Sequence, residues 1–278
     1  MISFIVLHYK NIEETLLCLE NLKKIIEKEE ASIVVVDNNT LNDIDKKKIL
    51  EYTKDIVVLD KNYGFAYANN KGILYTKDKY NPEFYCVINN DVFIHKKAFI
   101  KEIYKMYDKY HFDMLGPKIA SPTGESINPF PVLKTKHEII AEIKKCQKLI
   151  KIYNSVLLTT MLFIYIKLKR FFIKPKIIKN GTQIEKKVAL HGCAIIFSKK
   201  YIQKYNNGFY EGTFLYHEEE FLYQRVMQDR LISIYDPNLE VFHKEGSSLK
   251  KKIKSTRKNK LYREKERLKS LKLLLIEI

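Results

Sequence analysis

The chain has 278 residues, 46% of them hydrophobic, enough for the core of one large domain with or without a smaller appendage. Fifty lysines and arginines against 33 aspartates and glutamates give a formal net charge of +17, which favours an anionic partner: nucleic acid, anionic lipid or a phosphorylated substrate. Its 4 scattered cysteines, without a CxxC pair, argue against a zinc site or a disulfide framework and indicate a reducing compartment. An apolar run begins at residue 2, so we expect no secretory signal peptide.

The N-terminal part of the chain alternates between strand and helix patterns. The run at 2–7, apolar except for Ser3, is typical of a buried strand, and apolar residues then recur at helical spacing over 12–26. The predicted elements are strands at 2–7, 33–36 and 56–59 and helices at 12–26 and 44–52. This order predicts a doubly wound α/β domain with right-handed crossovers.

Two of the buried strand patterns end in carboxylate and amide side chains. Ile33–Asp37 is followed by Asn38 and Asn39, and the apolar run that begins at Tyr85 stops at Asn89-Asn90-Asp91 before it resumes. Such residues either satisfy their own backbone in an Asx-turn or bind a metal or a ligand. Because open α/β sheets bind ligands beyond the carboxyl ends of their parallel strands, we expect the two strand tips to meet at one edge.

The segment at 62–72, NYGFAYANNKG, places Gly64 directly before a helical stretch. A glycine at the start of a helix lets the backbone approach an anion closely, so the segment is either a phosphate or sugar contact or an ordinary loop-to-helix junction. Its spacing matches neither the Rossmann GxGxxG fingerprint nor the P-loop.

The segment from about 137 to 178 departs from this alternation. Its apolar run, Val156–Ile166, has lysines on both sides and is too short to span a bilayer, which needs about 20 residues. It is either a helix packed inside the protein or on a partner, or an in-plane membrane anchor with its bases on lipid phosphates. Before this segment we expect a helix at 98–107, a strand or loop at 113–119 and a turn at 121–124.

The C-terminal part returns to regular structure with a strand pattern at 187–197. Gly192 interrupts that pattern, which indicates a bulge or the close approach of a ligand or a neighbouring strand. Three adjacent carboxylates at 218–220 suit the first turn of a helix, and their repulsion is relieved if one is protonated, metal-bound or turned to solvent. The remaining predicted elements are a helix at 199–205, strands at 231–235 and 239–242 with a turn between them, and a basic helix at 249–272.

Seven motifs, in this order, resemble glycosyltransferase family 2, and more narrowly its rhamnosyltransferase-like branch, which builds bacterial surface polysaccharides. They are HYKN (8–11), VVVDNN (34–39), NYGFAYANNKG (62–72), INNDV (88–92), HGCAIIF (191–197), FLYHEEEF (214–221) and VFHKEGSS (241–248). The resemblance covers about residues 1–250 without the segment at 137–180. It implies a GT-A fold, a mixed sheet flanked by helices, in a domain at 1–248 with a helical insertion at about 137–180 and a basic helical tail at 249–278.

The resemblance also implies an activity: inverting transfer of a hexosyl or rhamnosyl group from a UDP- or dTDP-sugar to a growing surface glycan, with Mg²⁺ or Mn²⁺ as cofactor. Carried over by position, the catalytic carboxylates are Glu218 and Glu219, with Glu219 as the expected base, and the metal ligands are Asp91 and His243. The implied donor-binding residues are His8, Tyr9, Asp37, Asn39, Asn62, Gly64, Phe65, Asn69, Asn89, Asn90 and Asp91, and the acceptor-binding residues are Gly192 and Cys193.

The expected location is cytoplasmic, on the inner face of the cell membrane, with a lipid-linked glycan acceptor, anionic lipid and further copies of the chain as partners. A nucleic-acid partner is not expected, because the positive charge concentrates at 144–170 and in the tail rather than among aromatic residues on one face. The alternative is a catalytically decayed nucleotide-sugar-binding or membrane-associated scaffold, since asparagine stands at two of the three positions of the family's DXD motif.

Overall fold

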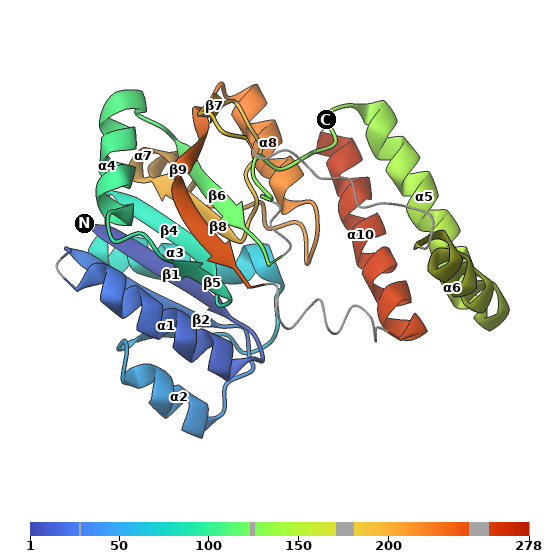
Figure 1. Ribbon diagram of the computed structural model, residues 1–278, viewed down its shortest axis with the longest axis horizontal. Coiled ribbons are helices and arrows are strands. Elements are labelled where there is room, and N and C mark those ends of the chain that lie inside the picture. The colour runs from blue at the N-terminus through green and yellow to red at the C-terminus, as the bar shows by residue number, and fades with distance from the viewer. Residues whose placement is uncertain (28, 123–125, 171–180, 245–255, 278) are drawn as a thin grey trace.

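The computed structural model describes residues 1–27, 29–122, 126–170, 181–244 and 256–277. Within them, nine strands form one mixed sheet (Figure 1): β1 (Ile2–His8), β2 (Ala31–Asp37), β3 (Asp55–Val58), β4 (Phe84–Asn89), β5 (Val92–Ile94), β6 (Met114–Ala120), β7 (Glu185–Lys186), β8 (Ala194–Ser198) and β9 (Ser233–His243). The helices are α1 (Ile12–Ile26), α2 (Asp43–Leu50), α3 (Phe65–Tyr80), α4 (Phe99–Tyr110), α5 (Lys136–Asn154), α6 (Val156–Arg170), α7 (Lys199–Tyr205), α8 (Glu218–Gln228) and α10 (Arg257–Glu277). Part of the predicted turn at 121–124, the end of the predicted insertion and the predicted domain boundary at 248 lie outside the described residues.

The sheet has the strand order β3-β2-β1-β4-β8-β6-β9-β5, and β7 pairs with β9. The first four strands are parallel, as the alternation of strands and helices predicts, whereas β8 runs antiparallel to both β4 and β6. Helices α1, α2 and α4 pack on one face of the sheet, and α3, α7 and α8 pack on the other. Because both faces are covered, the central strands are buried and almost continuously apolar.

The carboxyl ends of the first parallel strands meet at one edge, as predicted. In the register of the sheet, His8 at the end of β1 lies opposite Asp37 at the end of β2. On the other side of β1, Leu7 lies opposite Asn89, the last residue of β4. The polar side chains that follow these strands therefore gather at the edge where an open α/β sheet binds its ligands.

Three predicted strands differ from those observed. The expected strand at 187–197 is confined to β8, so Gly192 lies in the loop before that strand rather than inside it. The expected strands at 231–235 and 239–242 are one strand, β9, whose register against β6 shifts between Pro117 and Lys118. The predicted turn is present as this irregularity, where the backbone N–H of Asn238 donates to the Asp236 carboxylate at 2.9 Å.

Three helices lie beside the sheet domain rather than on its faces. Figure 1 shows α5 and α10 side by side, and their apolar residues form a third cluster with α8 that contains Ile139, Cys146, Phe221, Leu271 and Leu274. The expected helical insertion is present as α5 followed by α6. Within the described ranges no single helix is long and apolar enough to cross a membrane; α5 and α6 together pass that test, but they meet at a bend of 114°.

Candidate active site

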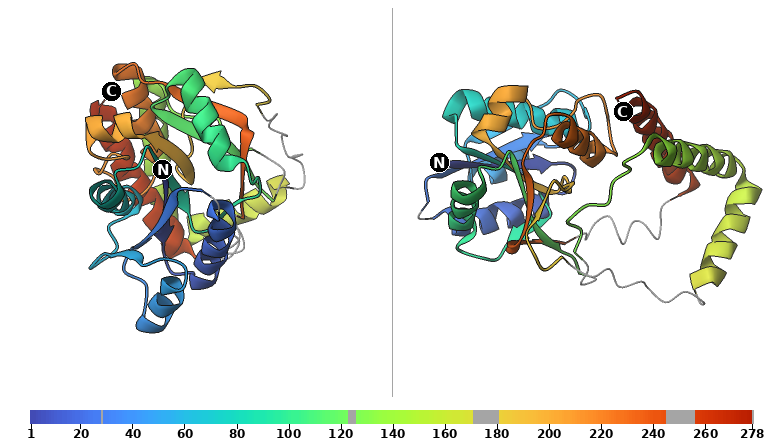
Figure 2. Two further views of the ribbon diagram at one scale, coloured as in Figure 1. Left: turned by 90° about the vertical axis from the view of Figure 1, so that its left-hand side faces the viewer. Right: turned by 90° about the horizontal axis from the view of Figure 1, so that it is seen from above.

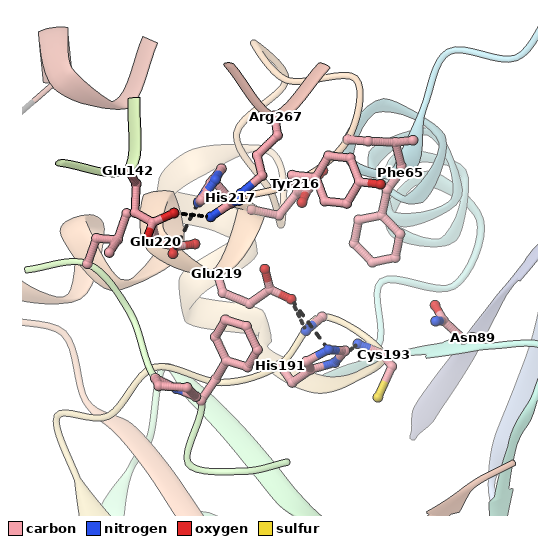
Figure 3. Close-up of a pocket in the computed structure, with 16 residues that line it drawn as sticks. Phe65, Asn89, Glu142, His191, Cys193, Tyr216, His217, Glu219, Glu220 and Arg267 are labelled. Carbon is pink, nitrogen blue, oxygen red and sulfur yellow. Dashed lines mark hydrogen bonds and ion pairs between the residues drawn. The ribbon is translucent and has the colours of Figure 1, made fainter. Parts of the chain in front are cut away.

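A cavity of about 640 Å³ opens between the carboxyl edge of the sheet, the start of α8 and the helices α5 and α10. Figure 3 shows Glu219 reaching into it toward His191, with Asn89 at one side and Glu142 and Arg267 at another. The lining residues are Phe65, Asn89, Phe130, Pro131, Leu133, Glu142, His191, Gly192, Cys193, Leu215, Tyr216, His217, Glu218, Glu219, Glu220 and Arg267. The cavity thus combines the predicted catalytic carboxylates and both predicted acceptor-binding residues.

The backbone before α8 turns the three adjacent carboxylates in different directions. Tyr216 and His217 both have left-handed backbone angles, with φ of 75° and 71°, and the helix begins at the next residue. Such conformations are costly for residues other than glycine and tend to persist at functional sites. Since successive helical residues are about 100° apart, Glu218 turns into the protein while Glu220 comes within 3.1 Å of His217 Nδ1.

Glu219 is held in the cavity by the loop that precedes β8. The backbone N–H of Gly192 donates a hydrogen bond to Oε1 of Glu219 at 3.0 Å, and His191 Nε2 lies 3.9 Å from the same oxygen. A Cβ atom at position 192 would lie 3.1 Å from the ring of Phe65 and 3.4 Å from Glu219 Oε1. The predicted close approach at Gly192 is therefore made by the side chain of Phe65 and the carboxylate.

His191 is a site residue that the sequence did not reveal. The backbone N–H of Cys193 donates to His191 Nδ1 at 3.1 Å, so the proton of the neutral ring is on Nε2, the nitrogen facing Glu219. The backbone N–H of His191 in turn donates to Asn128 Oδ1 at 2.8 Å. The available signal was a polar residue directly before the glycine of HGCAIIF, but only the folded loop directs it at a carboxylate.

Glu218 and Glu219 differ in their surroundings. Glu218 is only 6% exposed, and burial, reinforced by the charge of Glu219, raises its pKa to about 8. At neutral pH Glu218 is therefore mostly protonated, and the repulsion expected among adjacent carboxylates is reduced. Of the two residues, Glu219 has the carboxylate that contacts Gly192 in the cavity.

The predicted metal ligands contact each other at the edge of the sheet. His243 Nε2 lies 3.1 Å from Asp91 Oδ1, and the backbone N–H of Lys244 donates to the carbonyl oxygen of Asp91 at 3.0 Å. The ring of His243 is 6.4 Å from that of His191, which itself faces Glu219. Asp91 itself does not line the large cavity. His243 next to Asp91 and His191 next to Glu219 are neighbours, so the two carboxylates have adjacent imidazole rings.

Asp91 and His243 could supply two of the ligands of a divalent cation. A carboxylate oxygen with an imidazole is a donor set that suits Mn²⁺, and Mg²⁺ is commonly held by one or two carboxylates together with substrate phosphates. The Nδ1 atom of His243 is buried without a hydrogen-bond partner among the described residues. Among the described residues, no group of three or more His, Cys, Asp or Glu side chains could hold a metal ion. Any further ligands of the ion would therefore have to come from substrate and water.

A second cavity, of about 200 Å³, adjoins the first and shares Phe65 and Leu215 with it. It contains the predicted donor residues Tyr9, Asn62 and Gly64, and its other lining residues are Leu7, Asn38, Phe214 and Tyr262. Two neighbouring cavities therefore open at the carboxyl edge of the sheet, where open α/β sheets bind their ligands.

The loop before α3 is fixed by side-chain amides. Asn62 Oδ1 accepts hydrogen bonds from the Gly64 backbone and from Asn38 Nδ2, both at 2.9 Å. Gly64 has φ of 87°, and a Cβ atom there would lie 2.1 Å from the carbonyl oxygen of Phe214. A glycine is therefore required at position 64, because the segment before α8 passes too close to it for a side chain. The predicted loop-to-helix junction is present, and it also lines the second cavity.

Several predicted donor residues lie outside both cavities. Asp37 is buried, and its carboxylate accepts the backbone N–H groups of Thr40 and Leu41 at 2.8 and 3.2 Å, which is the Asx-turn alternative. Asn39, in the same turn, is exposed and has φ of 60°. The donor roles predicted for Asp37 and Asn39 stay predictions.

The remaining predicted donor residues make internal contacts. His8 and Asn90 both bond to the hydroxyl of Thr15, at 2.7 and 2.8 Å, and burial lowers the pKa of His8. Asn69 is fully buried and donates to the carbonyl oxygen of Phe65 at 3.0 Å, while its Oδ1 has no partner among the described residues. These contacts position the strand ends and the start of α3.

Comparison with known proteins decides the family. Residues 3–205 match the family model described as "Glycosyl transferase family 2". This chain belongs to glycosyl transferase family 2. The chain is 30% identical over 132 residues to the low-salt glycan biosynthesis hexosyltransferase Agl10 of Haloferax volcanii; the match spans 47% of this chain and 40% of that protein.

Solved structures identify the fold of this chain as GT-A. One is TarS 1–349 of S. aureus, with a TM-score of 0.53 and 13% identity over 88% of this chain and 60% of that chain. Another is the mannosyltransferase PcManGT of Pyrobaculum calidifontis, crystallised with GDP-Man and Mn²⁺, with a TM-score of 0.54 and 10% identity over 99% of this chain and 72% of that one. The predicted family and fold are thereby confirmed.

Proposed function

We propose that this family 2 glycosyltransferase moves a sugar from a nucleotide-sugar donor to a hydroxyl of a growing surface glycan, with inversion at the anomeric carbon and Glu219 as the base. The observation that carries the proposal is the fixed position of Glu219, whose Oε1 accepts the Gly192 N–H at 3.0 Å inside a cavity large enough for a sugar. A general base must be held within reach of the proton that it removes, and this hydrogen bond supplies that constraint.

The reaction would proceed as a single displacement. The acceptor oxygen forms a bond to the anomeric carbon as the bond from that carbon to the phosphate oxygen breaks, the nucleoside diphosphate leaves, and the acceptor proton passes to Glu219. With Oε1 engaged by Gly192, Oε2 would receive the proton. Glu218, whose pKa burial raises to about 8, is mostly protonated at pH 7 and adds little charge beside Glu219. A positioned base of this kind contributes about 10²–10⁴-fold to the rate.

The activity is proposed to be metal-dependent. Asp91 and His243, which lie 3.1 Å apart, would hold Mg²⁺ or Mn²⁺, and the bound ion would neutralise charge on the leaving diphosphate. This proposal is supported by the donor set of the pair, a carboxylate oxygen beside an imidazole nitrogen. The asparagines at 89 and 90 leave the metal with fewer protein carboxylates than the family's DXD motif supplies.

The donor is proposed to be a UDP- or dTDP-sugar, with rhamnose as the first sugar to test. The smaller cavity has aromatic residues from four parts of the chain, Tyr9, Phe65, Phe214 and Tyr262, which suit stacking of a pyrimidine base. The sugar would then lie toward the larger cavity, because Phe65 and Leu215 separate the two spaces.

The acceptor is proposed to be a lipid-linked glycan of a capsule, O-antigen or similar polymer, extended on the cytoplasmic face of the membrane. Support comes from the position of the larger cavity, one side of which is formed by Glu142 of α5 and Arg267 of α10. Both helices also contact α6, which follows α5 in the chain.

The proposal is tested by nucleoside diphosphate release from a panel of UDP-, dTDP- and GDP-sugars, with glycan acceptors and Mn²⁺. We expect turnover with one donor, and we expect Glu219→Gln to lower kcat by about 10²–10⁴-fold while the donor Kd stays within about twofold. Glu51→Gln, an exposed carboxylate after α2, is the matched control. Unchanged turnover by Glu219→Gln would exclude this base, and donor binding without turnover by the wild type would favour the scaffold alternative.

A further inference from the structure

Helix α6 exposes large apolar side chains around its whole circumference. They are between 36% and 71% exposed, and the residues are Val156, Leu157, Leu158, Met161, Phe163, Ile164, Tyr165, Ile166 and Leu168. A helix that is apolar on every side is normally buried, and a contiguous apolar surface of this kind marks an interaction site. Among the residues that the structure describes, few pack against this helix.

Helix α6 is attached to the body of the protein at its first turn and again at Phe163. Thr159 is 3% exposed, and its hydroxyl donates to the carbonyl oxygens of Ile152 and Ser155 at the end of α5. The 114° bend then directs α6 away from α5, and Figure 2 shows it projecting from the body of the molecule. The ammonium group of Lys260 lies 4.0 Å from the centre of the Phe163 ring.

Positive charge flanks this apolar helix in the chain and stands on the two helices that contact it. The exposed lysines are Lys144, Lys148 and Lys151 on α5, Lys167 on α6 and Lys258 on α10. The sequence from 143 to 170 contains no aspartate or glutamate. An apolar helix flanked by bases has the composition of a segment that lies in the interface of an anionic bilayer.

We propose that α6 is an in-plane anchor in an anionic membrane, with its apolar side chains at the boundary of the acyl chains and the flanking lysines on lipid phosphates. Its 15 residues measure only about 22 Å, which is less than the bilayer core of about 30 Å. Helix α5 does not extend it, because Ile139, Cys146 and Tyr153 of α5 are buried in the protein. A second copy is disfavoured, since pairing two α6 helices would bring like-charged lysines together in a chain of net charge +17.

An anchor at α6 would bring the site to a lipid-linked acceptor. This delivery of the acceptor, unlike the anchor itself, rests on the proposed function. Helix α5 connects the two, since its Glu142 lines the larger cavity and its last residue lies two positions before α6. With α6 in the lipid interface, the acceptor cavity would lie beside the membrane surface. Binding to lipid does not itself depend on catalysis.

The test is co-sedimentation of the full chain with vesicles of phosphatidylcholine alone or with 30% phosphatidylglycerol. We expect binding at least tenfold tighter to the anionic vesicles, weakened in 1 M salt, because salt screens surface charge. The variant Leu157→Ser with Ile164→Ser should bind at least tenfold more weakly, and Lys148→Glu with Lys151→Glu should lose the preference for anionic lipid. The matched control is Ile44→Ser with Val58→Ser, which alters side chains that are 69% and 53% exposed elsewhere, and it should bind like the wild type.

Unchanged vesicle binding by the α6 variant would overturn the proposal. So would a dimer in sedimentation velocity that this variant dissociates, because a second copy would then cover α6. Activity on a short water-soluble acceptor should be retained by the α6 variant, which separates the anchor from the chemistry. Normal vesicle binding with no transfer to any acceptor would contradict the proposed function and leave the anchor supported.

Discussion

The backbone N–H of Gly192 donates a hydrogen bond to Oε1 of Glu219 at 3.0 Å. This contact joins the loop before β8 to the first turn of α8, two segments that are far apart in the sequence. It fixes the carboxylate in the larger cavity next to His191, and it depends on the absence of a side chain at position 192.

Gly192→Ala should reduce turnover without unfolding the protein. The added Cβ would be 3.1 Å from the Phe65 ring, so the ring or the loop must shift and Glu219 with it. Because a misplacement of about 1 Å can cost about 10²-fold, we expect kcat to fall by about 10- to 100-fold. Adding Phe65→Leu should restore part of the rate, and steady-state kinetics of the single and double variants would check both effects. An unchanged kcat in Gly192→Ala would contradict the role of this contact.

Glu218 should make stability depend on pH. Burial raises its pKa in the folded protein to about 8, so the folded state binds the proton more tightly than the unfolded state. Its contribution is therefore favourable below the ordinary carboxyl pKa and is lost as the pH rises through about 8. Glu218→Gln should flatten the fall in Tm between pH 5 and pH 9, measured by thermal unfolding. The assignment would be refuted if the Tm of the wild type and the Tm of Glu218→Gln changed by the same amount between pH 5 and pH 9.

Asp91→Ala should weaken donor binding only when a divalent cation is present. With Mn²⁺, calorimetry should show at least tenfold weaker binding of the donor, because one of the two protein ligands is lost. In EDTA the wild type and the variant should bind the donor alike. Asp108→Ala removes an exposed carboxylate of α4 and serves as the control. Equal affinities with Mn²⁺ would show that Asp91 does not hold the cation.

His191→Asn should lower kcat and leave the donor Kd unchanged. The shorter side chain no longer presents the Nε2 proton toward Glu219, whose Oε1 lies 3.9 Å from that nitrogen, so the site loses one polar contact beside the base. We expect a decrease of up to about tenfold, because one polar contact is worth about 0.5–1.5 kcal/mol. His191→Gln, which retains an N–H donor of similar reach, should recover part of the rate. The control is His111→Asn, since asparagine tolerates the left-handed backbone at that exposed residue. A loss of donor affinity instead of kcat would assign His191 to the donor site.

The parallel half of the fold followed from local patterns. Runs such as Ile2–Leu7 and Ile33–Val36 are buried on both faces, and the amphipathic spacing at 12–26 matches α1, because each pattern records which side chains leave water. Boundaries were harder where a polar residue interrupted the pattern. At 236–238 the chain continues as β9, since the Asx contact of Asp236 is accommodated inside the strand.

The sequence by itself determined the family, the mixed α/β core and the two clusters of acidic side chains, since these depend on periodicity and on motifs that are local in the chain. Only the tertiary structure decided which groups share a cavity. It brought Arg267 of α10 beside Glu142, directed His191 at Glu219, and committed the carboxylate of Asp37 to its own turn. These relations are set by the packing of segments up to 125 residues apart and by the direction of single side chains, and no local pattern encodes either.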